Sequence, residues 1–595
     1  MGLFIRISTD QPQHRHDHLK LHKQQSAVPR RAIFARPLSF VNQKFAMHRF
    51  KADIFRQPRL NFDVLCLVCN SLTEISDVLS FALTCSELTV PALQRRLRIS
   101  PINLSNDELV HSFHRFIFAD EPARAQYIYG LKLPRANRLP LGEPPGSRLR
   151  PLQDPLMEIL KAAVHLQYIS FPTAIDLFPV LTAAANIASL RELHIVFADF
   201  GGDCRWSPWK LLGTFRSPLR SLRIDSSNDS ANEGFSVKLI HDYLASFATT
   251  LEVLELHSID FYPSPSPLTT QFTALRSLTT HTVLNFDEST MEVLLRLFPN
   301  LDNTLSLGFL GVMDGEHDLL GLRERSKEVQ TARTWSGLDH VVCDVRLAFL
   351  MALQCPIRRM HITVLRFYGR GLLGPVLRDN CPRLLHLSLL NNNSLRDLDD
   401  LFPASEEVNA LTHLVVFVDV EVRKVYGRPT SIPWAQFKDK LLDSMKHLRL
   451  THLRVVFRYT VWHEATAAPS AIRERDAMYT AHETDLHAVA TRVFDAMPTI
   501  QYVLLATCGH TYQCLPRNEA PPGATETLNK WHASKAWRAP DSPLTKGQGH
   551  SKAKASPVAL SREAAETIVA QEELHLSREE EVKVQRCDDA TARRR

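Results

Sequence analysis

The sequence lacks the features that mark membrane-spanning and secreted proteins. No apolar run reaches about eighteen residues, so no transmembrane helix is expected. The first residues, Met1–Arg6, have too short an apolar core for a signal peptide, and Arg6 stands where a myristoylation signal has Ser or Thr. The ten cysteines are scattered, so they are expected to be reduced thiols. We therefore expect a cytoplasmic or nuclear location and no membrane partner.

The chain also lacks a strong excess of charge of either sign. Its 70 Lys and Arg residues face 64 Asp and Glu residues, and a net charge of +6 gives no reason to expect a nucleic-acid partner. In other respects the composition is ordinary, because 44% hydrophobic and 23% charged residues are typical of soluble globular proteins. At 595 residues the chain is long enough for about two to four domains.

A complete catalytic or cofactor motif is missing as well. Gly369–Gly374 has the glycine spacing GxGxxG of a dinucleotide-binding turn and follows a strand-like run, 361–367. Such a site needs an acidic residue at the end of the next strand, and that strand ends at Asn391–Asn393. A glycine-rich turn between repeats explains the motif better, and an NAD-binding enzyme ranks third among the interpretations. We therefore expect no catalytic residue and no cofactor.

Two cysteine patterns fall short of a metal site. Cys66 and Cys69 have CxxC spacing, but no second pair of ligands lies nearby, which favours buried thiols. Cys508, His510 and Cys514 supply three ligands where a structural zinc site needs four. No metal site is expected.

Composition and periodicity divide the chain into five segments. Asp107–Phe118 has a helical pattern, and several prolines follow it. Near the end, Ser561–Gln585 can form a solvated helix within otherwise polar sequence. The segments are a disordered basic arm (1–57), an apolar helical block (58–99), a helical and Pro-rich connector (100–155), a leucine-punctuated region (156–515) and a disordered tail (516–595).

The helical block is the segment around which the rest is organised. Its apolar residues Val64, Val68 and Leu72 recur with the spacing of one helical face. Asp77 is a candidate N-cap for a second helix, and Pro91 suits the first turn of a third. Three helices in about forty residues bury little surface, so such a unit usually needs a partner.

This block resembles an F-box, the helical motif that joins a substrate receptor to an SCF-type ubiquitin ligase. The second half of the family pattern is an aspartate, aliphatic residues and an Ala-Leu-x-Cys/Ser run, and it matches Asp77–Cys85. The departure is Asn61, which stands where the family has proline. The first half of the pattern matches Leu60, Asp63, Val64, Leu65, Val68 and Leu72.

The F-box resemblance implies two partners: a Skp-type adaptor and, through it, a cullin-RING ligase. In that family the apolar faces of the helices bury against the adaptor. The adaptor-binding residues that the resemblance implies are Leu60, Val64, Leu65, Val68, Leu72, Val78 and Leu79.

A repeat follows between residues 156 and 515. Its unit is a helix-like segment and then an apolar-x-x-apolar-x-apolar run, as in Leu190-Leu193-Ile195 and Leu384-Leu387-Leu389, with starts mostly 24 to 32 residues apart. A single unit would expose its apolar strand and helix face, and stacking the units buries both. The pattern resembles degenerate leucine-rich repeats, whose characteristic asparagine is present at Asn392 and absent from most other units.

We therefore predict an α/β protein: an N-terminal three-helix F-box followed by an irregular leucine-rich-repeat solenoid, a curved parallel sheet with outer helices. A conventional α/β domain, whose parallel strands also alternate with helices, is the alternative fold. In the solenoid, residues between the apolar strand positions line the concave face. Those expected to bind a protein substrate are His194, Arg223, Asp225, Glu255, His257, His361, Ser388 and Arg454.

The predicted function is that of a non-catalytic substrate-recognition subunit of an SCF-type ubiquitin ligase. A leucine-rich-repeat interaction scaffold that works outside any ligase is the alternative. The identity of the protein substrate does not follow from the sequence.

Overall fold

The structure is a computed structural model. The chain forms two compact units, Met1–Phe62 and Asp63–Arg595, and the elements below belong to the second from Asp63 on. The predicted arm, 1–57, and Leu60 lie outside the described residues. In the described part no helix combines the length and apolarity needed to cross a bilayer. The described residues are 61–119, 122–134, 150–172, 178–197, 211–226, 235–261, 269–283, 286–310, 319–364, 370–390, 401–403, 405–422, 424–425, 428–429, 434–463, 470, 472, 483–514, 525–540 and 556–587.

Three α-helices form the helical block, where the sequence predicts three. They are α1 (Phe62–Ser71), α2 (Ile75–Ala82) and α3 (Thr89–Ile99), with a 3-10 turn, η2 (Ser86–Leu88), before α3. Pro91 falls in the first turn of α3, as predicted. The cap prediction is wrong, because α2 begins at Ile75 and Asp77 lies in its first turn. There the negative charge of Asp77 still favours the helix N-terminus.

A long sheet, seventeen-stranded in the described residues, carries the rest of the second unit. From β1 to β17 the strands pair in parallel, and β18 and β19 add antiparallel pairs. A two-stranded hairpin, β14 (Lys424–Val425) and β15 (Arg428–Pro429), lies apart from it. The strands are β1 (Ile102–Asn103), β2 (Gly130–Lys132), β3 (Tyr168–Pro172), β4 (Glu192–Phe197), β5 (Ser221–Ser226), β6 (Phe235–Ser236), β7 (Val253–Asp260), β8 (Ser277–Val283), β9 (Thr304–Leu310), β10 (Leu338–Asp344), β11 (Ile357–Val364), β12 (Leu384–Leu390), β13 (His413–Val422), β16 (His452–His463), β17 (Tyr502–Cys514), β18 (Thr525–Arg538) and β19 (Val558–Ala559).

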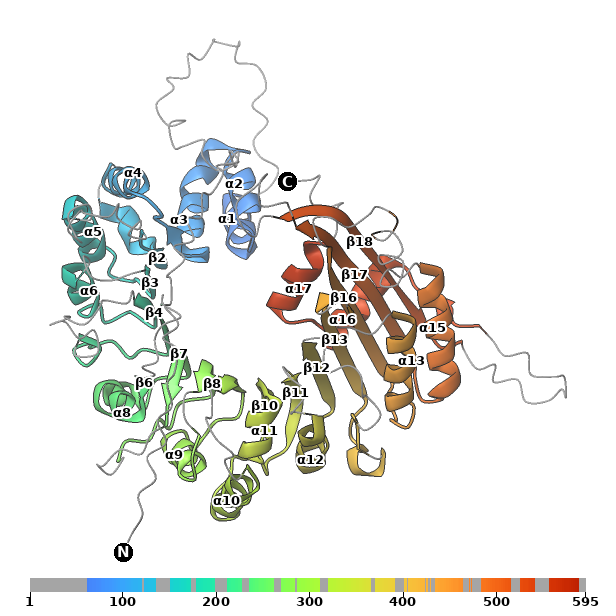
Figure 1. Ribbon diagram of the computed structural model, residues 1–595. Coiled ribbons are helices and arrows are strands. Elements are labelled where there is room, and N and C mark those ends of the chain that lie inside the picture. Colours follow the sequence, from blue (N-terminus) through green and yellow to red (C-terminus); the bar gives the residue numbers. More distant parts are fainter. Residues whose placement is uncertain are drawn as a thin grey trace, which may run out of the picture. The chain divides into compact units, whose positions relative to one another are not determined.

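Helices between the strands cover one face of this sheet (Figure 1). Local capping sets where some of them begin: the Asn106 side chain accepts from Leu109 N–H at the start of α4, and Asp344 accepts from two N–H groups at the start of α11. The structure is thus α/β, as predicted. The helices are α4 (Asp107–Phe118), α5 (Arg150–Ala162), α6 (Phe178–Ala184), α8 (Val237–Leu244), α9 (Thr290–Leu297), α10 (Leu319–Ala332), α11 (Val345–Met351), α12 (Arg370–Asn380), α13 (Trp434–Met445) and α15 (Glu483–Ala496), with 3-10 turns η3 (Pro122–Tyr127), η4 (Ala245–Phe247) and η7 (Ser405–Val408).

The main core lies between the sheet and these helices. Leu222, Leu254 and Leu278 are partners in register on three neighbouring strands, and each is fully buried. Each is the middle apolar residue, or its equivalent, of a predicted repeat unit. The recurring apolar spacing therefore builds a ladder of aliphatic side chains across the sheet, and this ladder explains why the strands pair in this order.

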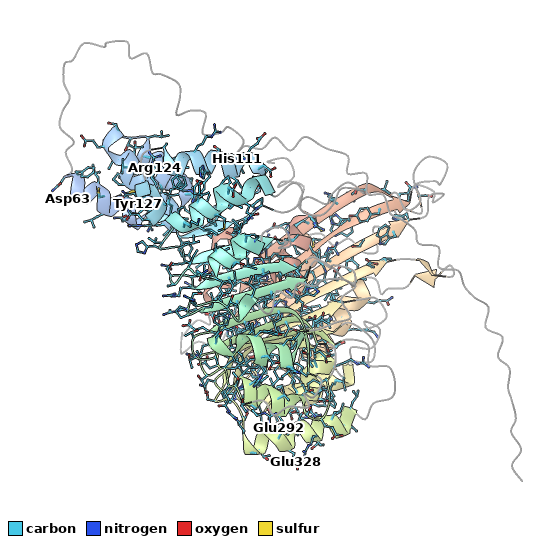
Figure 2. The ribbon with its side chains drawn as sticks, turned by 90° about the vertical axis from the view of Figure 1, so that its left-hand side faces the viewer. Asp63, His111, Arg124, Tyr127, Glu292 and Glu328 are labelled. Carbon is cyan, nitrogen blue, oxygen red and sulfur yellow. The ribbon has the colours of Figure 1, made fainter. Side chains whose placement is uncertain are left out.

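The predicted connector, 100–155, is part of this core instead of a separate linker. Leu104 and Ile117 are buried in the main cluster, and β1 and β2 are strands of the sheet. The Arg98 guanidinium stacks over the Tyr127 ring at 4.6 Å, where α3 meets η3. Figure 2 labels Tyr127 in this region. The proline-rich stretch 135–149 lies outside the described residues.

The predicted disorder of the tail is wrong for 525–540 and 556–560, while Ser561–Gln585, predicted as a solvated helix, is helical but divided in two. These residues form β18, β19 and two helices, α16 (Arg562–Gln571) and α17 (Arg578–Gln585). Ser561 caps α16, and Ser577 with Glu580 forms a capping box on α17, an S-x-x-E signal that the sequence analysis missed. Both helices lie on the face of the sheet opposite α13 and α15 (Figure 1).

Candidate functional site

The first candidate surface lies on the helical block. The block has a small core of its own, in which Cys69, Val78 and Ala92 are buried. Leu83, Leu67 and Val90 are 87%, 68% and 61% exposed. We call the block's exposed set in the second unit the apolar helical surface, and its members are Val64, Leu67, Val68, Leu79, Leu83 and Val90. Several exposed large apolar side chains on so small a block make it a candidate interaction site.

The predicted adaptor-binding residues divide into three groups in the structure. Val64, Val68 and Leu79 belong to the apolar helical surface, whereas Leu65 and Leu72 are half-buried, and Leu72 packs against the block core. Val78 needs correction, because it is fully buried in the block core and has no surface to offer a partner. Leu60 lies outside the described residues. The helical period found the face, but it could not separate positions that point into the small core from those that point out.

The second candidate surface is the polar face of the sheet, the face away from the helices of the main core. Its residues fall in register: His194 pairs with Arg223, and Arg223 with Glu255, on β4, β5 and β7. The side chains form an ionic network. Asp225 Oδ2 lies 3.0 Å from both His194 Nε2 and Arg223 Nε, and Arg223 Nη1 lies 3.2 Å from Glu255 Oε1. His281 extends it, 3.7 Å from Glu255.

The network sets the protonation of its members. Burial alone would raise the pKa of Asp225, but hydrogen bonds from His194 and Arg223 hold it below its usual value. Glu255 raises the pKa of His281 by accepting its hydrogen bond. His257 is another predicted substrate-binding residue. Its ring centroid lies 5.9 Å from that of His281, and the two rings are tilted relative to each other. The open part of the polar face is therefore mixed in charge and largely paired within itself.

The C-terminal helices cover the other part of the polar face, over β12 to β18. Leu574 and Leu576 pack there with Val415, Phe417 and Val456 in a second apolar cluster. The predicted substrate residues His361, Ser388 and Arg454 need correction, because they lie at this covered part. The Ser388 hydroxyl donates to Glu580 Oε1 at 2.5 Å, and Arg454 donates to the Leu574 carbonyl at 2.6 Å.

Ion pairs hold the same C-terminal segment to the sheet. Glu573 pairs with Arg358 and Arg359, which also pair with Asp339. Lys583 Nζ lies 2.8 Å from Asp419 Oδ2. The segment is thus anchored along its length.

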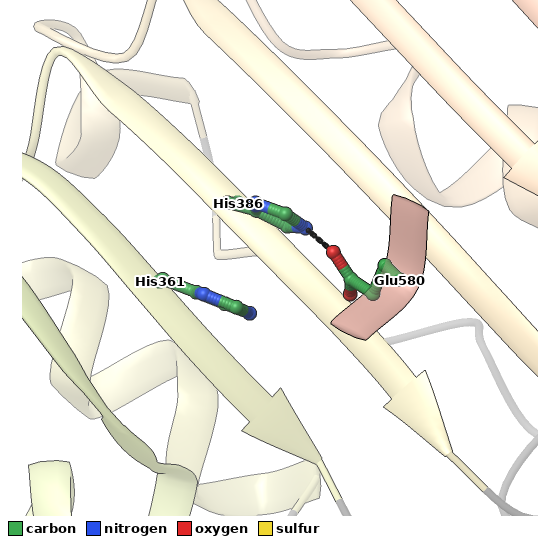
Figure 3. Close-up of side chains that lie close together, drawn as sticks. All are labelled: His361, His386 and Glu580. Atoms are coloured by element: carbon green, nitrogen blue, oxygen red, sulfur yellow. Dashed lines mark ion pairs between the residues drawn. The ribbon is translucent and has the colours of Figure 1, made fainter. Parts of the chain in front are cut away.

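A compact histidine–glutamate cluster, His361, His386 and Glu580, lies beneath α17 (Figure 3). The two imidazole rings stack at a centroid distance of 4.0 Å, and His386 Nε2 lies 2.9 Å from Glu580 Oε2. Burial, with the neighbouring His386, lowers the pKa of His361 to about 3. Burial opposes ionisation of Glu580, yet His386 and the Ser388 hydroxyl lower its pKa to about 2. The sequence analysis missed His386 and Glu580, because Glu580 lies almost two hundred residues further along the chain.

A second cluster repeats this construction with other residues. His413 and His452 stack at 4.4 Å, and Glu572, just after α16, lies 3.0 Å from His413 Nε2. Burial lowers the pKa of His452 to about 4. Arg383 also lies 3.3 Å from Glu572, so this carboxylate already forms an ion pair with a permanently charged side chain.

The motifs that the sequence analysis rejected lie on a helix and at buried positions. Gly371 and Gly374 of the GxGxxG run lie inside α12, and Gly369 lies outside the described residues. Cys69 is buried in the core of the helical block, as expected. Cys508 and His510 are buried beside Cys587 of the C-terminal segment, whose sulfur lies 3.2 Å from His510 Nε2.

Comparisons with known proteins leave the family open. No family model matches the sequence, and no curated protein matches it. One solved structure, described as the crystal structure of a TLR13–ssRNA13 complex, aligns with 70% of this chain at 12% sequence identity and a TM-score of 0.26. The alignment spans 59% of the length of that chain. A likeness this distant carries no argument about what the present chain binds.

Proposed function

We propose that the chain is a substrate-recognition subunit of an SCF-type ubiquitin ligase. In this proposal the helical block is an F-box that binds a Skp-type adaptor, and the strand–helix units are irregular leucine-rich repeats that bind a protein target. The observation that supports it is the apolar helical surface, whose exposed Leu67, Leu83 and Val90 have no covering segment among the described residues. Burying such side chains contributes about 1.5–3 kcal/mol each.

The chain itself would do no chemistry in this role. It would bring its target close to a ubiquitin-loaded enzyme carried by the cullin, and proximity would raise the rate. The open part of the polar face, around Arg223 and Glu255, is the region left for the target, because the chain's own helices cover the part around Arg454.

A pair of point variants tests the adaptor contact. Leu67→Asp places a charge in the apolar helical surface, and Leu320→Asp is its control, because Leu320 on α10 is 66% exposed and Leu67 is 68% exposed. We expect Leu67→Asp to weaken binding of a purified Skp-type adaptor at least about tenfold, since burying an unpaired charge costs several kcal/mol. Leu320→Asp should bind as the wild type does. Both should keep the wild-type melting temperature.

Point variants are better than deletion of the block, because Leu97 of α3 belongs to the main core and its carbonyl accepts from Tyr129 N–H at 3.0 Å. Affinity purification of the wild-type chain is the second arm of the test. Adaptor and cullin in the eluate support the proposal. An eluate with other proteins but neither of these would favour the alternative, a repeat scaffold that works outside any ubiquitin ligase.

A further inference from the structure

We propose that the histidine–glutamate cluster, His361, His386 and Glu580, is a site for a divalent transition-metal ion, with Zn²⁺ as the best fit. The inference is independent of the ubiquitin-ligase proposal. Two imidazoles and one carboxylate are a known donor set for zinc, which leaves a fourth position for water or another oxygen. The three donor atoms lie within 4.8 Å of one another, so small side-chain movements bring them to a single ion.

The strands and the helix place the three donors on one side. His361 on β11 and His386 on β12 are partners in register, and their rings are parallel to within 10°. Both imidazole edges therefore point the same way, toward Glu580 on α17 (Figure 3). Glu580 itself is held by Ser577 N–H, which donates to Oε2 at 2.9 Å, and by the Ser388 hydroxyl on Oε1. Such outer contacts fix the orientation of a ligating carboxylate.

A buried nitrogen in the cluster lacks a proper partner. His386 Nε2 is out of contact with solvent and has no well-formed hydrogen bond, although it lies 2.9 Å from Glu580 Oε2 in an ion-pair contact. Leaving a buried polar atom in this state is unfavourable. A cation that accepts the His386 lone pair and one from Glu580 removes that cost.

The neighbouring clusters show why this one is different. Glu572 of the second histidine cluster is shared with Arg383, and Asp225 on the open face is bonded to Arg223. A guanidinium supplies the cation in both. Among the described residues no Lys or Arg forms an ion pair with Glu580, which is only 5% exposed. A buried carboxylate needs a compensating charge; His386 supplies one only when it is protonated, whereas a metal ion supplies it with both imidazoles neutral.

Binding would exchange one contact for another. His361 Nε2 now lies 2.8 Å from Ser388 Oγ, and ligation replaces that hydrogen bond with a metal bond. Ser388 Oγ, left beside the ion, is a candidate for the fourth position. The ion would join β11 and β12 to α17 and so hold the C-terminal segment on the polar face. Because the site forms only when α17 is docked, the binding free energy becomes stability of that segment.

Metal content of the full-length chain tests the proposal. The chain is stripped with a chelator, dialysed against Zn²⁺, and its bound zinc is measured by mass spectrometry of the elements. We expect the wild type to retain one more equivalent of zinc than Glu580→Gln. Glu572→Gln is the matched control, because it breaks a His–Glu contact of the same segment and should retain as much zinc as the wild type.

Two further measurements keep the test decisive. His361→Gln removes a different ligand, so it should lose the same equivalent even if Glu580→Gln fails to fold, which circular dichroism would reveal. Co²⁺ in place of zinc should give the visible bands of a nitrogen- and oxygen-ligated ion in the wild type and lose them in both ligand variants. Equal zinc in wild type, Glu580→Gln and His361→Gln, or none in any, would overturn the proposal.

Discussion

The helical block and the strand–helix sheet treat leucine in opposite ways. In the sheet, residues such as Leu254 and Leu414 are fully buried between strands and helices. In the block, Leu67 and Leu83 are mostly exposed, although the sequence around them is just as apolar. The difference arises from size, because three short helices are too few to bury all of their own apolar side chains. Exposing such apolar side chains to water is unfavourable, and we propose that a partner covers them.

The C-terminal segment shows the same need satisfied from within. The apolar side chains Val415 and Phe417 on the polar face would be exposed without α16 and α17, and Leu574 and Leu576 cover them. The sheet thus receives from its own chain the cover that the block is proposed to receive from an adaptor. Three experiments test this difference between the block and the sheet, and they follow from the largest expected effect to the smallest.

Removing residues 556–595 should have the largest effect, since it gives the sheet an uncovered apolar surface like that of the block. Loss of Leu574 and Leu576 burial alone would cost roughly 3–6 kcal/mol. We expect a lower denaturation midpoint, stronger binding of a hydrophobic dye and self-association in sedimentation. A truncated chain that stays monomeric with an unchanged midpoint would show that the segment is not needed as cover.

A leucine-to-alanine substitution should lower stability in the sheet and weaken adaptor binding in the helical block. Leu414→Ala leaves a cavity in the main core and should lower the free energy of unfolding by about 2–5 kcal/mol. Leu83→Ala, at an 87% exposed position, should change it by less than about 0.5 kcal/mol and weaken only adaptor binding. Chemical denaturation measures the first effect and a titration with adaptor the second. Similar losses of stability in both variants would contradict the difference in leucine burial between the sheet and the helical block.

The smallest effect concerns pH. The Arg358 side chain, which pairs with Glu573, holds the pKa of that carboxyl below its usual value of 4.5. A depressed folded pKa contributes stability above the unfolded value, and the contribution is lost as pH falls through the folded value. Glu573→Gln should therefore be less stable than wild type at pH 7 by at most about 1 kcal/mol, because the pair is partly solvated.

The gap in stability between wild type and Glu573→Gln should close below pH 4.5, as the wild-type carboxyl becomes protonated. Thermal melts of both proteins across this range measure it. Asp339 accepts from the same two arginines, so the Glu573→Gln variant keeps part of the acid sensitivity. A gap that stays constant with pH would mean that the ion pair contributes nothing.

The sequence predicted features that depend on local spacing. The 3.6-residue period of Val64 and Val68 gave the first helix of the block, and the recurring pattern around Leu254 gave parallel strands that alternate with helices. It failed where neighbours in space decide. Val78 and Val68 look alike in the pattern, but Val78 is buried with Cys69 and Ala92 in the block core, whereas Val68 on α1 is exposed.

The candidate site was harder to predict than the fold. His194, Arg223 and Glu255 follow from strand alternation, because every second residue faces away from the helices. The covering of Ser388 and Arg454 could not be foreseen without reading the capping signals at Ser561 and Ser577, which announce helices in a polar tail.

By itself, then, the sequence determined which residues are apolar on which face, and so which short elements form, because helix and strand periods are local properties. Tertiary structure alone decided that Glu580 meets His361 and His386 and that the tail covers part of the polar face. Such contacts join segments some two hundred residues apart. No local period encodes them, and only the mutual burial of the two surfaces selects them.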